Sequence, residues 1–257
     1  DGNAADDAPE LVIADTASAT LSGVLKVGGS RRGELTVESG GVVSNTHDGF
    51  IGRYSGSTGI ATVTGANSKW TNTENLFVGQ SGNGTLNVEA GGVVSSGSGS
   101  IGSGSGSTGV ATVTGSGSQW NNSSYLRVGY YGDGTLNVEA GGVVSNTEGY
   151  LGYGSASTVM ATITGTGSQW NNSSDLCVGR SGIGTLNVEA SGVVANTWGA
   201  IGRYSGSTGT TMVTGSGSQW NNSGALFVGH EGTGTLNVEA GGVVANTSGY
   251  IGYKTDS

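Results

Sequence analysis

The sequence predicts an all-β fold, a right-handed parallel β-helix (solenoid) of about ten rungs with roughly 25 residues each, where a rung is one complete coil of the chain. Three observations predict this fold. A motif repeats at a fixed interval of 50 residues, each repeat consists of two similar halves, and each half carries three short apolar runs. Units of this kind cannot bury their apolar side chains alone, so consecutive copies must stack and share one core.

Two motifs make the repeat visible. A tryptophan recurs once per unit, as Trp70, Trp120, Trp170 and Trp220, and the heptapeptide Gly-Thr-Leu-Asn-Val-Glu-Ala occupies residues 84–90, 134–140, 184–190 and 234–240. We expect an N-terminal segment at residues 1–24, followed by the repeat β-helix at residues 25–257. Within that segment, residues 11–13 are expected to form a capping strand, because an uncapped edge recruits other strands.

Each half of a unit supplies three strands in chain order. In one unit we predict strands within residues 126–129, 134–139 and 141–146, and then within residues 150–152, 161–165 and 168–172. Val, Ile, Thr or Trp alternates with polar residues in these runs, which is typical of strands, and the Gly, Ser and Asn residues between them are typical of turns. No 3.6-residue periodicity occurs, so we expect no helix.

Alternation along each strand assigns its two faces. Leu86 and Val88 are expected to point into the core, and Asn87 and Glu89 outward. The tryptophans are expected in the core, two rungs apart and alternating with smaller Val-Val rungs; an exposed platform for sugars is the alternative. Asparagine recurs near one corner, where the amides can bond along the stack: Asn45, Asn72, Asn122, Asn146, Asn172, Asn196, Asn222 and Asn246.

A β-propeller is the alternative fold, because propeller blades have a similar repeat length. Blades are built from antiparallel hairpins with tight turns, and nothing in a blade requires its two halves to resemble each other. The resemblance between the two halves of each unit therefore favours the β-helix.

Charge and composition disfavour several classes of partner. The net charge is −9, and the nine Lys and Arg residues are scattered along the sequence, whereas phosphate binding requires clustered cations; we expect no nucleic-acid partner. No segment approaches the roughly 18 apolar residues of a membrane span, so we expect no direct membrane insertion of this fragment. Cys177 is the single cysteine. With its repeat equivalents Phe77, Arg127 and Phe227, it marks a permissive slot that we expect at the surface.

The repeat resembles a known bacterial family. Gly-Thr-Leu-Asn-Val-Glu-Ala-Gly-Gly-Val-Val, followed by Ile-Gly-x-x-x-Gly-Ser-Thr-Gly-x-Ala-Thr-Val-Thr-Gly-x-Gly-Ser-x-Trp, is similar to the repeats of type V secretion autotransporter passengers and PEP-CTERM-associated surface proteins, over about residues 25–253. The resemblance implies an exported rod, often an adhesin, that is extracellular or at the bacterial cell surface and is joined elsewhere to an outer-membrane barrel or a sorting tail. It supplies no catalytic residue.

We therefore predict a non-enzymatic extracellular surface rod that mediates adhesion or self-association and is a fragment of a larger secreted bacterial passenger. One alternative is a subunit of an extracellular filament or matrix that assembles through β-helix ends. Another is a polysaccharide-active β-helix enzyme, which would need converging carboxylates. The acidic residues available for that role are copies of one repeat position, expected as a solvated column: Glu89, Glu139, Glu189 and Glu239.

Other chemistry has little support in the sequence. His47 and His230 are expected far apart in the stack, so we predict no metal site, and nothing predicts a cofactor. Thr-x-Thr columns also suggest an ice-binding face, but Met212 and the intervening Asn and Glu residues interrupt that pattern.

The positions that depart from the repeat are the best candidates for ligand binding. They follow the Val-Gly and Ile-Gly pairs, where large aromatic and arginine side chains recur at turns. Such residues give a large contact area with a polar tip, which favours recognition. The predicted partner is a glycan or a host or neighbour-cell surface protein, with the chain itself as a further possibility. The predicted ligand-binding residues are Arg53, Tyr54, Tyr130, Tyr131, Tyr153, Arg180, Trp198, Arg203 and Tyr204.

Overall fold

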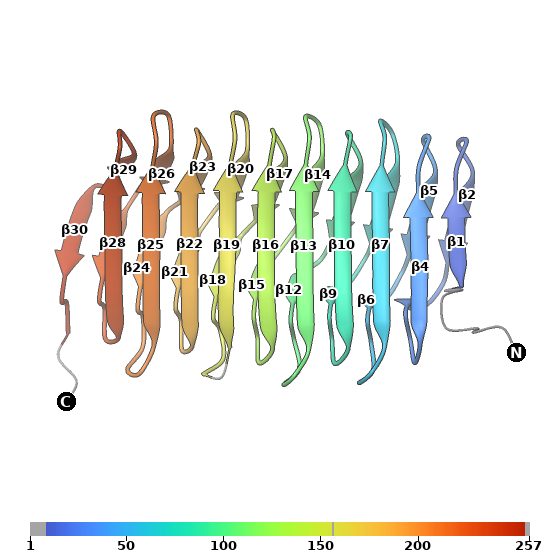
Figure 1. Cartoon of the computed structure of the whole chain (residues 1–257), viewed down its shortest axis with the longest axis horizontal. Helices are drawn as coiled ribbons and strands as arrows, with labels where there is room; N and C mark the ends of the chain where they lie inside the picture. The colour runs from blue at the N-terminus through green and yellow to red at the C-terminus, as the bar shows by residue number, and fades with distance from the viewer. Residues whose placement is uncertain (1–8, 156, 255–257) are drawn as a thin grey trace, which may run out of the picture.

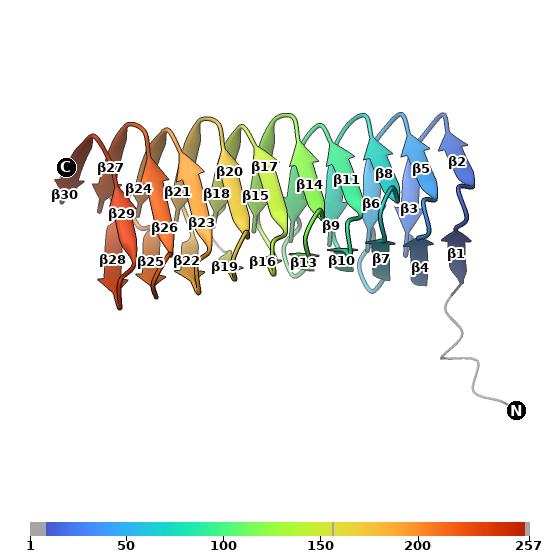
Figure 2. The ribbon, with the colours of Figure 1, turned by 90° about the horizontal axis from the view of Figure 1, so that it is seen from above.

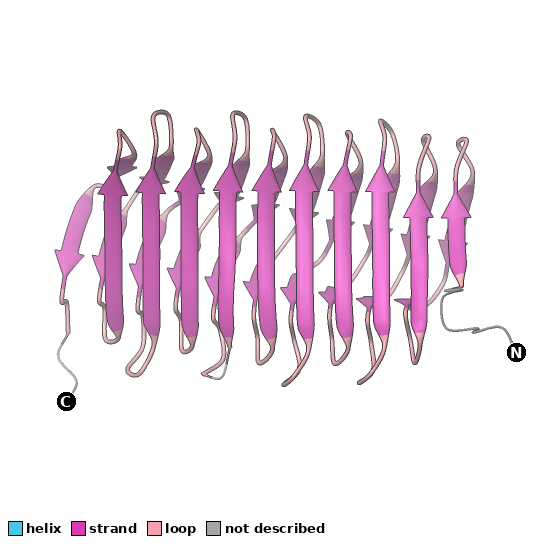
Figure 3. Ribbon diagram, viewed as in Figure 1, coloured by secondary structure: helices cyan, strands magenta, loops and turns pink. Residues whose placement is uncertain are grey.

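The computed structural model describes residues 9–155 and 157–254 and shows a parallel β-helix (Figure 1). Its strands form three sheets of ten, and each rung contributes one strand to every sheet. The prediction of about ten rungs with about 25 residues each is confirmed. The described residues contain strands, turns and no helix (Figure 3). The propeller alternative is wrong, because all the strand pairs of the three sheets are parallel pairs between successive rungs.

The strands follow one another around the three sheets. The first sheet contains β1 (Glu10–Ile13), β4 (Arg32–Val37), β7 (Thr58–Thr64), β10 (Asn83–Glu89), β13 (Thr108–Thr114), β16 (Asp133–Glu139), β19 (Thr158–Thr164), β22 (Ile183–Glu189), β25 (Thr208–Thr214) and β28 (Thr233–Glu239). The second contains β2 (Ser18–Leu21), β5 (Val42–Asn45), β8 (Lys69–Asn72), β11 (Val93–Ser96), β14 (Gln119–Asn122), β17 (Val143–Asn146), β20 (Gln169–Asn172), β23 (Val193–Asn196), β26 (Gln219–Asn222) and β29 (Val243–Ala245). The third contains β3 (Leu25–Val27), β6 (Gly49–Ile51), β9 (Leu76–Val78), β12 (Gly99–Ile101), β15 (Tyr125–Val128), β18 (Glu148–Leu151), β21 (Asp175–Val178), β24 (Trp198–Ile201), β27 (Ala225–Val228) and β30 (Ser248–Ile251).

The path of the chain gives the rod its shape. In Figure 1 the first sheet faces the viewer and its strands ascend; the chain then passes over the top into the second sheet and returns behind through the third (Figures 1 and 2). Because the chain advances away from the N-terminal end as it turns in this sense, the coil is right-handed. The six strands predicted for one repeat unit correspond to β15 through β20.

Stacking in register determines which side chains reach the core. Leu86 pairs with Ala111 and Val88 with Val113, and all four side chains are buried. Asn87 lies beside Thr112 on the outer face. The predicted inward and outward faces are therefore confirmed.

The four repeat tryptophans lie inside the second sheet and are fully buried. Each one stacks between smaller residues of the rungs on either side; Trp120, for example, pairs with Val94 and Val144. The core interpretation is confirmed, and the alternative of an exposed sugar platform is wrong. The large ring in one rung fits because the next rung supplies valine at the same place, which keeps the packing dense.

The predicted asparagine corner satisfies the buried indole groups. The Trp170 Nε1 donates to Asn146 Oδ1 at 2.8 Å, and Asn146 Nδ2 donates to Asn172 Oδ1 at 2.6 Å. The next unit repeats this chain from Trp220 through Asn196. One rung uses serine instead, because Ser96 both accepts from Trp120 and donates to the following asparagine. A buried donor or acceptor left without a partner is costly, so these bonds fix the corner.

We expect Asn146→Ala to lower the free energy of unfolding by about 1–3 kcal/mol more than Asn146→Ser. Alanine leaves the Trp170 indole N–H and the Asn172 carbonyl oxygen without their partner, whereas a serine hydroxyl can serve both, as Ser96 does in its own rung. The two variants differ by one oxygen atom, so the comparison isolates the hydrogen bonds. Urea unfolding followed by tryptophan fluorescence measures the difference, and equal midpoints for the two variants would contradict the role assigned to this corner.

The segment before the repeats contributes a strand to each of the first two sheets. Strand β1 pairs with β4 from Glu10↔Glu34 to Ile13↔Val37, and β2 pairs with β5 from Ser18↔Val42 onward. Residues 11–13, expected as a capping strand, are therefore the terminal strand of the first sheet.

Candidate functional site

The outer face of the third sheet carries two adjacent columns of large side chains. The residue before the last of each strand points outward, and register places these residues one above another, as in Arg127↔Tyr150 and Phe227↔Tyr250. The second column lies in the turn that follows each strand. There the backbone N–H of Tyr153 donates to Gly129 O, and each following rung repeats the bond. The two columns therefore run side by side along the rod.

These columns carry a continuous run of rings and guanidinium groups from the rung of β15 to the rung of β30. We call this run the aromatic–arginine stripe. Its members are Tyr125, Arg127, Tyr130, Tyr131, Tyr150, Tyr153, Arg180, Trp198, Arg203, Tyr204, Phe227, His230, Tyr250 and Tyr253.

Two arginines organise the first part of the stripe by stacking on tyrosine rings. The Arg127 guanidinium carbon lies 3.9 Å from the Tyr125 ring centroid and 4.4 Å from that of Tyr153. Arg180 covers the same Tyr153 ring at 4.0 Å and reaches Tyr204 at 5.0 Å. Cation–π contacts of this kind hold a flexible side chain flat against its neighbours. The arginines are therefore positioned by contacts that leave their Nη groups available.

The second part of the stripe is mostly aromatic. Trp198 packs 5.0 Å from Phe227 between ring centroids, and Phe227 stacks on Tyr250 at 4.6 Å. Arg203 joins the two parts, because its guanidinium carbon lies 4.7 Å from the Trp198 ring and 5.3 Å from the Tyr204 ring. The contacts run from one rung to the next, so the stripe is continuous over these six rungs.

A serine rung separates the stripe from a smaller patch nearer the N-terminus. Ser103 donates to Ser100 at 2.9 Å, and both side chains are buried. Beyond them, Phe50 stacks on Phe77, with Arg53 4.2 Å from the Phe50 ring centroid. Tyr54 adjoins Arg53 at 5.0 Å and is 47% exposed.

The guanidinium groups have few acceptors within the protein. Among the residues that the structure describes, the side chains of Arg53, Arg127 and Arg180 make no ion pair and donate no hydrogen bond, and the shielded Nε atoms of Arg53 and Arg127 have no partner. Arg203 donates through Nη1 to the Cys177 sulfur at 3.1 Å. In the described part of the chain, the other guanidinium nitrogens of Arg53, Arg127 and Arg180 have no protein acceptor and are not buried, so they are available to an external acceptor.

The acidic residues beside the stripe have other partners. Glu148 Oε2 accepts a hydrogen bond from the Tyr150 hydroxyl at 2.7 Å, and burial together with this bond raises the pKa of Tyr150. Burial also raises the pKa of Asp175, against the opposing charge of Arg203, while Ser174 donates to its carboxylate. The two carboxylates therefore do not neutralise the arginines through direct ion pairs.

The predicted site residues are grouped by the fold. Arg53 and Tyr54 lie in the smaller patch, and the other seven lie in the stripe: Tyr130, Tyr131, Tyr153, Arg180, Trp198, Arg203 and Tyr204. Sequence reasoning did not include Arg127 and Phe227, which it assigned to a permissive surface slot. Both residues lie in the outward-facing column on the strands of the third sheet, where the same register that stacks the core would have placed them.

The prediction that this slot lies at the surface is wrong for Cys177. Its side chain points outward from β21 yet is 0% exposed, because neighbouring stripe residues, including Arg203, cover it. Burial raises the pKa of the Cys177 thiol. The cations that are scattered in sequence are also gathered here in part, since Arg127, Arg180 and Arg203 come from the fifth, seventh and eighth rungs of one face.

The glutamate column lies on the outer face of the first sheet. Thr114 separates Glu89 from Glu139 in the register, so these carboxylates are two rungs, or about 10 Å, apart. The ion pairs within the described residues are Arg32–Glu34, His230–Glu231 and Lys254–Glu231, and none involves this column. In the described part of the chain, no group of three His, Cys, Asp or Glu side chains could hold a metal ion. Nor does that part contain a helix able to cross a membrane.

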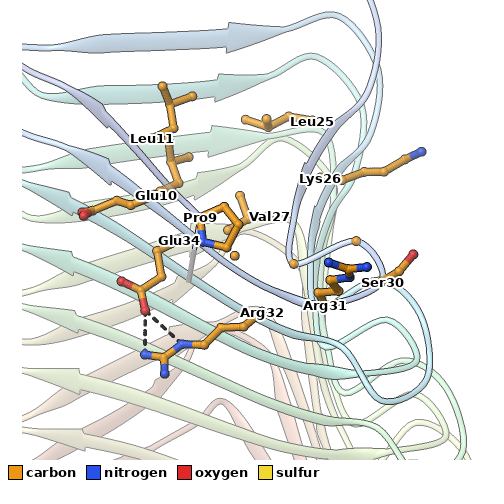
Figure 4. Close-up of a pocket in the computed structure, with 14 residues that line it drawn as sticks. Pro9, Glu10, Leu11, Leu25, Lys26, Val27, Ser30, Arg31, Arg32 and Glu34 are labelled. Atoms are coloured by element: carbon orange, nitrogen blue, oxygen red, sulfur yellow. Dashed lines mark hydrogen bonds and ion pairs between the residues drawn. The ribbon is translucent and has the colours of Figure 1, made fainter. Parts of the chain in front are cut away.

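A hollow of about 460 Å³ lies at the N-terminal end of the rod (Figure 4). Its apolar lining includes Leu11, Leu25 and Val27, and the Arg32–Glu34 ion pair lies beside it (Figure 4). These side chains belong to the first described rungs, so the hollow is the end of the apolar core. It contains no converging catalytic groups.

Comparisons with known proteins add no argument about the function of this chain. No family model matches the chain, and no curated protein matches it. Among solved structures, the chain is similar to the crystal structure of the TibC-catalyzed hyper-glycosylated TibA55-350 fragment, with 18% sequence identity and a TM-score of 0.33, over 96% of this chain and 92% of that one. A likeness this distant carries no argument about function.

Proposed function

We propose that this chain is a non-enzymatic extracellular rod that mediates adhesion by presenting the aromatic–arginine stripe to a glycan or to a surface protein of another cell. The observation that carries the proposal is the continuity of the stripe over six successive rungs. Tyrosine, tryptophan and arginine are the residues that contribute most to recognition surfaces, because they combine a large contact area with polar tips.

The rest of the rod surface has a different character. The outer face of the first sheet follows the repeat and presents Thr, Asn and Glu, as at Thr112, Asn137 and Glu139. The stripe departs from the repeat and leaves several rings accessible, with Tyr131 49% exposed. A regular scaffold with one irregular face is the arrangement expected when the scaffold carries a binding site. The resemblance of the repeats to bacterial surface proteins supports a place outside the cell.

The arrangement of charged groups favours binding over catalysis. Glycoside cleavage needs a pair of carboxyl groups that converge on one bond. Here the carboxylates of the first sheet form a periodic column, and those beside the stripe are engaged by the Tyr150 hydroxyl, the Ser174 hydroxyl or the Lys254 ammonium group. The stripe offers stacked rings and N–H donors, which are means of binding.

We expect simultaneous replacement of Tyr130, Tyr131, Arg203 and Tyr204 by serine to abolish ligand binding without unfolding the rod. The fourth rung already carries serine at the position of Tyr130, since Ser103 follows the same Val-Gly or Ile-Gly pair, so the backbone accepts the change. A glycan and matrix-protein array probed with the unmodified chain and the variant measures the effect.

The matched control carries four serine substitutions on the opposite face, at Asn87, Asn137, Asn187 and Asn237, which point outward from the first sheet. Circular dichroism should show that both variants keep their strand content. If the stripe variant retains every ligand of the unmodified chain, the stripe is not the adhesive surface.

A further inference from the structure

We propose that the ligand of the stripe is an anionic polysaccharide whose oxyanion groups, carboxylate or sulfate, are bound by Arg127, Arg180 and Arg203. This inference rests on the proposed function and specifies the chemistry of its ligand.

Stacking on tyrosine rings orients the guanidinium groups so that an anion can bind at the edge of the guanidinium plane. Arg127 and Arg180 stack on tyrosine rings at 3.9–4.4 Å, which fixes each guanidinium against a ring face. A guanidinium carries five N–H donors in its plane and matches a carboxylate or sulfate through paired hydrogen bonds. Within the described residues the side chains of these two arginines donate to no protein acceptor; the Nε of Arg127 is buried, and the Nη groups remain for an external ligand. An oxyanion supplies the acceptors that are missing.

The spacing of the arginines suits a linear polymer. They come from the fifth, seventh and eighth rungs, so their positions along the axis differ by about 10 Å and about 5 Å. A free anion would occupy one of these positions, whereas a chain with charges at regular intervals can occupy all three. Exposed rings such as Tyr131 and Tyr253 lie along the same line and offer apolar faces for sugar rings.

The stripe offers cationic donors even though the whole chain is acidic. The net charge is −9, yet three of the nine cationic residues lie here without a carboxylate within ion-pair distance in the described structure. The carboxylates beside the stripe bond to other groups, Glu148 to Tyr150, Asp175 to Ser174 and Glu231 to Lys254, so none of them occupies the arginine N–H groups. An acidic peptide is the weaker candidate, because its backbone lacks the apolar ring faces that stacked aromatics complement.

The experiment compares four immobilised probes with the full chain: polygalacturonate, its methyl ester, dextran sulfate and poly-L-glutamate. We expect binding to polygalacturonate or to dextran sulfate, which distinguishes carboxylate from sulfate recognition, and no binding to the ester. The double variant Arg127→Gln with Arg180→Gln should lower affinity roughly tenfold or more, because each arginine loses charge-assisted hydrogen bonds. Lysine at both positions should restore only part of it, since lysine keeps the charge without the planar fork.

The control is Arg31→Gln with Arg32→Gln, which removes the same charge at the N-terminal end of the rod, away from the stripe, and should leave affinity unchanged. Equal binding of the ester, an equal loss in the control, or arginine-dependent binding of poly-L-glutamate at the same affinity would overturn the inference. If no anionic polysaccharide binds but the array identifies a neutral ligand that the four-serine variant loses, the inference fails and the proposed function stands. If the array yields no stripe-dependent ligand of any kind, both fail.

Discussion

Replacing Trp170 with alanine is expected to lower the free energy of unfolding by about 3–5 kcal/mol, the cost of a large cavity in a rigid core. The ring is fully buried between Val144 and Val194 of the neighbouring rungs, and its N–H is bonded to Asn146. The neighbouring rungs cannot collapse into the space, because backbone hydrogen bonds fix the distance between strands. Guanidinium unfolding followed by far-ultraviolet circular dichroism measures the loss.

Two further variants identify the source of this effect. Trp170→Phe keeps most of the ring but leaves the Asn146 carbonyl oxygen without its donor, so we expect an intermediate loss. Gln169→Ala changes the adjacent residue, which points outward, and should cost less than about 0.5 kcal/mol. If Trp170→Ala lowers the free energy of unfolding no more than Gln169→Ala does, the Trp170 ring is not buried in the core. The exposed-platform interpretation of the tryptophans would then be restored.

The fold could be predicted from the sequence because every rung obeys the same constraints. Leu86 and Val88 point inward because alternate residues of a strand share one face, and the apolar face packs against the core. The next rung repeats the pattern. Repetition also reveals which features are structural: the tryptophan recurs every 50 residues, so it belongs to the scaffold. The serine at position 96 shows the limit of this reasoning, since only its hydrogen bonds show that it replaces asparagine in the corner.

The candidate site was predicted in part, because variable positions mark it but do not show how they meet. Tyr153 and Arg180 were identified as irregular turn residues, and the structure places them in contact. Arg127 was missed because its equivalents are Phe77, Cys177 and Phe227, a set with no common chemistry. These residues share one outward-facing position of the third sheet, at which side chains of one rung cover side chains of the next. Burial of that kind depends on the neighbouring rung, so the repeat position alone does not disclose it.

Gly142→Ala is expected to destabilise the rod by about 3 kcal/mol, the upper range for added volume in a packed site. A Cβ atom at this position would lie 2.2 Å from the carbonyl oxygen of Val113 and 2.7 Å from its carbonyl carbon, both backbone atoms of the preceding rung. A side chain can rotate away from such a contact, but this backbone is held by the hydrogen bonds of the sheet. The alanine must therefore push two rungs apart, and thermal unfolding should show a lower midpoint.

Two other glycines separate this collision from the conformational preference of glycine. Gly106 has a φ of +75° and open space around its Cβ position, so alanine there should cost only about 1–2 kcal/mol from the left-handed backbone. Gly23 has open space and no positive φ, so alanine should be neutral or stabilise by about 0.4–1 kcal/mol. The order Gly142, Gly106, Gly23 follows from the stacking of rungs. If the three variants lost equal stability, the cost would be a property of glycine itself, and the close approach of successive rungs at Gly142 would have no energetic consequence.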